Sequence, residues 1–132
     1  MRRRGSRRDS EGDYDALAGP TPARWLELDE AERLRLVEGY HRGARIRVPN
    51  LRAHGMIHVV VENQLAEDVE AAVAALDRLM SGGLDRHEAV HAIGSVLAEK
   101  IFSVLRDREP DSGEYVQELE ALTVEKWRGG GR

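Results

Sequence analysis

Apolar residues recur at helical spacing through almost the whole chain beyond residue 22. In the longest such stretch, residues 86–108, the apolar positions are three or four residues apart. They are Val90, Ile93, Leu97, Ile101 and Leu105. This spacing places the side chains on one face of an α-helix. No two runs with strand-like alternation stand near enough to pair, so the sequence predicts an all-α fold.

Capping and breaker residues divide the chain into about five predicted helices. Asp29 is typical of the N-cap of a helix ending at Gly43, and Pro49 suits the first turn of a helix running to about Glu67. A third helix is expected to end at Gly82, and Asp85 is expected to cap a fourth. A fifth is predicted over residues 112–127. Short connections between helices favour a single small bundle.

The two ends of the chain have a different composition. Five arginines lie in MRRRGSRR, and the following DSEGDYDALAG is acidic and polar rather than apolar, as an export signal would require. We therefore predict a disordered Arg-rich tail over residues 1–21, a helical domain over 22–127 and a disordered end over 128–132. The arginines have few aromatic neighbours, so we expect no nucleic-acid partner.

Composition restricts the chemistry that the chain can carry. With 132 residues it is long enough for one core, and it contains no cysteine. Disulfides, thiolate metal sites and cysteine nucleophiles are therefore excluded. No window approaches the roughly 18 apolar residues that a membrane span needs. We expect a cytoplasmic protein without a membrane partner.

Two pairs of histidines have the same spacing on two predicted helices. His54 and His58 are four residues apart, with Glu62 four further on, and His87 and His91 form the second pair. Residues four apart lie on one stripe of a helix, where two imidazoles and a carboxylate can bind one divalent ion. The intervening helix would let the two histidine helices lie side by side.

The spacing therefore predicts a metal site. Its ligands would be His58, Glu62, His87 and His91, with His54 as an alternate. Zinc is the default for such a donor set, although nickel, iron and copper use the same ligand types. One shared ion requires the imidazoles of His58 and His91 to lie within about 8 Å of each other, given bonds of about 2 Å. His41 has no partner at this spacing and is predicted to lie on the surface.

Residues 87–91, HEAVH, match the zinc-protease motif H-E-x-x-H, in which Glu88 would activate a water molecule. However, Leu97 stands where the metzincin form of the motif has its third histidine, and no sheet is predicted to hold a peptide. Glu88 and His91 also match the E-x-x-H element of di-iron bundles, but a second such element is missing. A zinc-dependent hydrolase and a di-iron protein are therefore secondary hypotheses. The main alternative is a metal-free helical interaction module, homodimeric or not, with histidines packed in its core.

The blocks H-x-x-x-H-x-x-x-E-N-Q, from His54 to Gln64, and R-H-E-A-x-H, from Arg86 to His91, carry a family resemblance. Over roughly residues 25–108 the chain resembles the bacterial family filed as domain of unknown function 1841. The resemblance implies a small helical domain and a functional role for His58, Glu62, His87 and His91. It implies no particular reaction.

Overall fold

The structure is a computed structural model that describes residues 14–46, 50–107 and 113–129. These residues form seven helices and no strand, which confirms the predicted all-α class. The helices are α2 (Pro22–Glu27), α3 (Glu30–Gly43), α4 (Leu51–Ala66), α5 (Glu70–Ser81), α6 (Arg86–Asp107), α7 (Gly113–Ala121) and α8 (Val124–Gly129). In this described part, no helix is both long enough and apolar enough to cross a bilayer.

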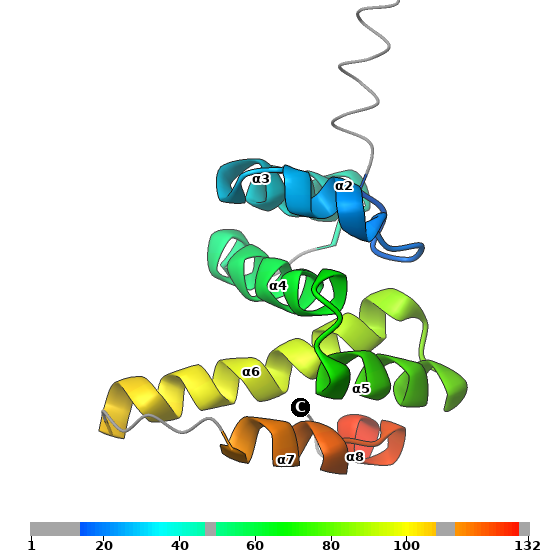
Figure 1. Cartoon of the computed structure of the whole chain (residues 1–132), viewed down its shortest axis with the longest axis vertical. Coiled ribbons are helices and arrows are strands. Elements are labelled where there is room, and N and C mark those ends of the chain that lie inside the picture. Colours follow the sequence, from blue (N-terminus) through cyan, green and yellow to red (C-terminus); the bar gives the residue numbers. More distant parts are fainter. Residues whose placement is uncertain (1–13, 47–49, 108–112, 130–132) are drawn as a thin grey trace, which may run out of the picture.

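The helices are stacked in layers along the long axis of the molecule (Figure 1). Helices α2 and α3 form one end, α4 lies beneath them, α5 and α6 follow, and α7 and α8 form the other end. Helix α4 contacts α2, α3, α5 and α6. It therefore joins the two ends of the molecule.

Side-chain caps start the main helices where the sequence predicts. Asp29 accepts a hydrogen bond from the Glu32 backbone N–H, and the Glu32 carboxylate accepts one from the Asp29 N–H, which completes a capping box. Asp85 accepts from the Glu88 N–H at the start of α6. Helix α4 is capped by Asn50, whose side chain accepts from the Ala53 N–H. Pro49 lies outside the described residues.

The prediction of a single helix over residues 112–127 is wrong, because this segment forms two helices, α7 and α8, with a helix break between them. Arg78 of α5 donates hydrogen bonds to the carbonyls of Leu119, at 2.6 Å, and Leu122, at 3.1 Å. These bonds satisfy the free carbonyls at the end of α7. The Thr123 hydroxyl then accepts from the Lys126 N–H and starts α8. Leu122, at the break, is buried in the core.

Helix α2 was not predicted from the periodicity. It is short, begins with Pro22 and buries Trp25. The Trp25 indole N–H donates to the Asn63 side chain at 2.9 Å, and Arg33 of α3 donates to the same oxygen at 2.9 Å. These contacts attach α2 and α3 to α4. A short helix is stable here because tertiary packing, rather than propensity, supplies most of its stability.

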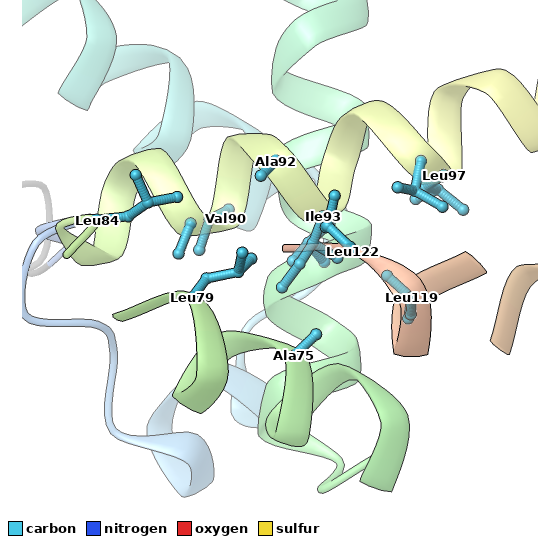
Figure 2. Packing of buried hydrophobic residues seen from close by; sticks show 12 residues of the cluster. Ala75, Leu79, Leu84, Val90, Ala92, Ile93, Leu97, Leu119 and Leu122 are labelled. Carbon is cyan, nitrogen blue, oxygen red and sulfur yellow. The ribbon is translucent and has the colours of Figure 1, made fainter. Parts of the chain in front are cut away.

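The apolar core has two parts. The larger is formed by α5, α6 and α7 together with Val61 of α4, and Figure 2 shows Leu79, Val90 and Ile93 meeting in it. The smaller lies between α3 and α4 at the other end and includes Trp25.

The predicted disordered tail, residues 1–21, includes residues that are packed in the structure. Tyr14 and Ala16 are buried, with exposures of 5% and 0%, and both belong to the smaller core cluster. Arg86 of α6 donates a hydrogen bond to the Ala16 carbonyl at 3.0 Å. Gly19 has a φ of +83°, and a Cβ there would lie 2.7 Å from the Arg86 guanidinium. Residues 1–13 lie outside the described residues.

The predicted disordered end also begins too early. Arg128 and Gly129 belong to α8. Residues 130–132 lie outside the described residues.

Candidate metal centre

Three helices bring all five histidines of the chain into one cluster. His41 comes from α3, His54 and His58 from α4, and His87 and His91 from α6. The ring centroids of His58 and His91 are 5.5 Å apart, well inside the separation that a shared ion requires. We call these five side chains the histidine cluster.

The ring nitrogens converge as well as the rings. The Nε2 atom of His91 lies 3.0 Å from that of His54 and 3.5 Å from that of His41. The Nε2 atoms of His41 and His87 are 3.3 Å apart. Four nitrogens placed tetrahedrally at about 2.0–2.1 Å from a zinc ion would be separated by about 3.3–3.4 Å. The observed spacings are close to that value.

Four of the histidines form the most compact set. One ring nitrogen from each residue lies within 4.8 Å of the nitrogens of the other three. The set is His41, His54, His58 and His91. This geometry is compatible with a single bound metal ion.

The prediction that His41 lies on the surface is wrong. Its exposure is 0%, and its ring contacts the other four histidines. Its Nδ1 lies 2.9 Å from the Val37 carbonyl, which can only accept, so Nδ1 carries the proton. In this tautomer the Nε2 lone pair is directed toward the cluster. The signal was present in the sequence, since His41 follows the apolar Val37 by four residues on the same stripe of α3.

The proton on His58 can also be assigned. The Tyr14 hydroxyl donates to the Glu62 carboxylate at 2.6 Å, because a carboxylate paired with an arginine can only accept. The Tyr14 oxygen must then accept from His58 Nε2, at 2.7 Å. This leaves a lone pair on His58 Nδ1, which is buried and has no hydrogen-bond partner among the described residues. A buried nitrogen of this kind is suited to a ligand.

Glu62 lies beside the histidine cluster but does not belong to the compact set. Arg86 donates to both of its oxygens at 2.8 Å, and Tyr14 donates to one of them. The Glu62 side chain is 1% exposed and that of Arg86 is 11% exposed, so the ion pair is almost fully buried. The sequence predicted Glu62 as a metal ligand, but its oxygens are instead hydrogen-bonded to Arg86 and Tyr14. Glu62 instead orients His58 through Tyr14.

Neither Tyr14 nor Arg86 was selected as a site residue from the sequence. Tyr14 lies in an acidic, polar stretch that resembles a disordered tail. Its burial, followed by the charge of Glu62, raises the pKa of its hydroxyl above the usual range, so the proton stays on the oxygen. Arg86 precedes HEAVH directly, and only the tertiary contact with Glu62 shows its role.

Burial keeps four of the histidines neutral. Burial, followed by the neighbouring imidazoles, lowers the pKa of His87 to about 4 and that of His91 to about 3. The pKa of His58 is lowered well below its usual range for the same reasons, and that of His54 is also lowered. Near pH 7 these four rings therefore carry lone pairs rather than charges, which is the state that binds a metal.

Glu88 is not placed for the role that the protease motif assigns to it. Its side chain is exposed and accepts a hydrogen bond from the Trp127 indole of α8 at 3.0 Å. His87, its neighbour in sequence, is by contrast buried in the cluster. One residue along a helix corresponds to a rotation of about 100°, which turns the two side chains to different faces. The HEAVH segment contributes two histidines but no water-activating carboxylate.

A groove of about 600 Å³ gives access to the cluster between α4 and α6. His54, His58 and His91 line part of it, and its other lining residues are mainly apolar. His54 and His91 are half-buried, whereas His41 and His58 are buried. The cluster is therefore closed on the α3 side and reachable from the groove.

Comparisons with known proteins add no relative, since no family model, no curated protein and no solved structure matched the chain. The resemblance to the family of unknown function stays a prediction.

Proposed function

We propose that this protein binds one divalent transition-metal ion through His41, His54, His58 and His91, with His87 as a fifth candidate ligand. The observation that carries the proposal is that one ring nitrogen from each of these four histidines, on three helices, lies within 4.8 Å of those of the other three. Among the four main ligands, His41 and His54 replace Glu62 and His87 of the sequence-based hypothesis.

The hydrogen bonds around the cluster support a metal over histidines that only pack together. His41 and His58 each use one ring nitrogen for a protein partner, which leaves the other with a lone pair for a ligand. Such outer partners fix the tautomer of metal-binding histidines. In the absence of a metal, the buried His58 Nδ1 would carry the cost of an unmade hydrogen bond, about 1–3 kcal/mol.

The donor atoms restrict the metal. Imidazole nitrogen suits zinc, copper, nickel and iron, whereas magnesium and calcium require oxygen. Glu62 is the buried carboxylate beside the cluster, and both of its oxygens are paired with Arg86. We therefore propose zinc as the default ion and expect magnesium and calcium not to compete with it.

The first test is metal content. Protein purified without an affinity tag should contain about one transition-metal ion per chain by elemental analysis, and a His41→Ala/His91→Ala variant should contain much less. A Glu88→Gln variant is the matched control, because it changes HEAVH without touching the histidine cluster. Equal, sub-stoichiometric metal in the wild type and the double variant, including after incubation with Zn²⁺, would overturn the proposal.

The same preparations distinguish the metal-free interaction module. If the histidines only pack, a chelator should leave the thermal unfolding temperature unchanged. If they bind a metal, the chelator should lower that temperature and added Zn²⁺ should restore it, since a ligand that binds only the folded state stabilises it.

A further inference from the structure

We propose that the groove beside the histidine cluster binds an alkyl carboxylate, with the carboxylate on the bound metal and the hydrocarbon chain between α4 and α6. This inference rests on the proposed metal site. It adds a class of ligand that the metal site alone does not specify.

The shape of the groove suits a small elongated molecule. Its volume of about 600 Å³ lies within the range of about 300–1,000 Å³ that is typical of small-molecule sites. Its lining along α6 runs from Val90 to Phe102, a distance of about 18 Å at 1.5 Å per residue. Ile57 of α4 packs over Gly94, whereas the small side chain of Ala98 leaves room on the α6 face.

The lining of the groove is apolar away from the histidines. Met56 and Ile57 of α4 face Ala98, Ile101 and Phe102 of α6. Phe102 is 68% exposed and Met56 is 55% exposed, although both are large apolar side chains. Covering them with hydrocarbon would remove apolar surface from water.

The polar groups of the groove are concentrated at its histidine end. The Ser95 hydroxyl already donates to the Ala92 carbonyl, and the Trp127 indole already donates to Glu88. The imidazoles of His54, His58 and His91 are therefore the polar groups that remain to meet a ligand. A ligand that fits has one polar head and an apolar body.

The charge of the metal site selects an anionic head. A divalent ion held by neutral imidazoles keeps its full positive charge, because none of these ligands is a carboxylate. Glu62 does not compensate it, since Arg86 neutralises that carboxylate. A partly buried cation without a counter-charge favours an incoming anion. Three of the four proposed ligands, His54, His58 and His91, line the groove, so an anion there would reach the ion as an added fifth ligand, an expansion of coordination that zinc sites can undergo.

The experiment uses Co²⁺-loaded full-length protein, whose visible spectrum reports on coordination. Acetate, butanoate, hexanoate and octanoate are titrated, all below their micelle concentrations. We expect each carboxylate to change the spectrum and the affinity to rise about fourfold per added methylene. An Ala98→Trp variant should bind Co²⁺ and acetate as the wild type does but should lose the dependence on chain length.

A Val116→Trp variant serves as the matched control. Val116 is an exposed apolar residue of α7 outside the groove, so the chain-length dependence should persist in this variant. Circular dichroism of both variants should match that of the wild type. The same dependence in Ala98→Trp and Val116→Trp would overturn the proposal, because the chain would then bind elsewhere.

The remaining outcomes separate the inference from the proposed function. Failure to bind Co²⁺ would overturn both. One Co²⁺ per chain with no response to any carboxylate would overturn the inference alone. A second copy of the chain bound in the groove would also overturn the inference alone. Sedimentation would then show a dimer that the Ala98→Trp substitution dissociates but octanoate does not.

Discussion

At the scale of single residues, one buried carboxylate determines the state of a histidine that it does not touch directly. Arg86 donates to both Glu62 oxygens, so the Tyr14 proton points toward Glu62 and the His58 Nε2 proton points toward Tyr14. The lone pair of His58 then lies on Nδ1. The chain of donors and acceptors therefore prepares a ligand through two intermediates.

A Glu62→Gln variant should be less stable and should bind metal more weakly. The substitution leaves the Arg86 charge buried without its partner, which costs about 3–5 kcal/mol. Loss of the outer hydrogen-bond partner of a metal-binding histidine reduces affinity by about 10–100-fold. Urea unfolding of the metal-free protein measures the first effect and a Zn²⁺ competition assay measures the second.

A Tyr14→Phe variant should separate the two effects of Glu62→Gln. It removes the hydroxyl between Glu62 and His58 but keeps the Glu62–Arg86 ion pair. We expect an affinity loss of about tenfold or more with a stability loss of about 1–3 kcal/mol. Unchanged Zn²⁺ affinity in this variant would contradict the proposed orienting role of Tyr14.

At the scale of helices, the close approach of α4 and α6 depends on a glycine. A Cβ built at Gly94 of α6 would lie 3.1 Å from Ile57 Cγ2 of α4. Gly94 follows His91 by three residues, so the same contact brings the histidines of the two helices together. On the other side of α4, Gly55 allows a similar approach of Leu34 from α3.

A Gly94→Val substitution should push α4 away from α6. Overpacking of this kind costs about 1–3 kcal/mol, and the separation should also weaken Zn²⁺ binding. Gly39→Val is the matched control, because a Cβ at Gly39 meets nothing within 4 Å. Thermal unfolding with and without Zn²⁺ measures both effects. If the two variants behave alike, helix propensity rather than helix contact explains the result.

Helix ends show how far the sequence specifies an element. Asp29 and Asp85 start α3 and α6 as predicted, because capping is a local contact within four residues. The break between α7 and α8 depends on Arg78, whose bonds to Leu119 and Leu122 span more than 40 positions. Local patterns contain no information about such a contact.

At the scale of the whole molecule, the buried histidines couple folding to pH. Burial lowers the pKa of His87 to about 4 and that of His91 to about 3, against a usual value of 6.5 in the unfolded chain. Above pH 6.5 both states are neutral and the folded state keeps its full stability. Below pH 6.5, the histidines of the unfolded chain become protonated while those of the folded protein stay neutral, so the free energy of unfolding decreases as the pH falls.

We therefore expect metal-free protein to lose stability between pH 6.5 and about 4. The slope should be roughly 1.4 kcal/mol per pH unit for each histidine that stays neutral in the folded state. Urea unfolding at several pH values measures it, and a His91→Gln variant should show a shallower slope. A wild-type stability that does not change over this range would contradict the burial of neutral imidazoles.

The sequence by itself determined the helical class, most helix boundaries, and the two histidine pairs as candidate ligands. Periodicity and capping are properties of neighbours along the chain, and these features follow from them.

Only the tertiary structure decided which groups meet at the cluster. It added His41 from a third helix, moved Glu62 from the predicted ligands to the Arg86 ion pair, and attached Tyr14 behind His58. His41 is 50 positions from His91, and Tyr14 is 44 positions from His58. Their contacts depend on how α3, α4 and α6 pack, and helix packing is decided by side chains that no single segment contains.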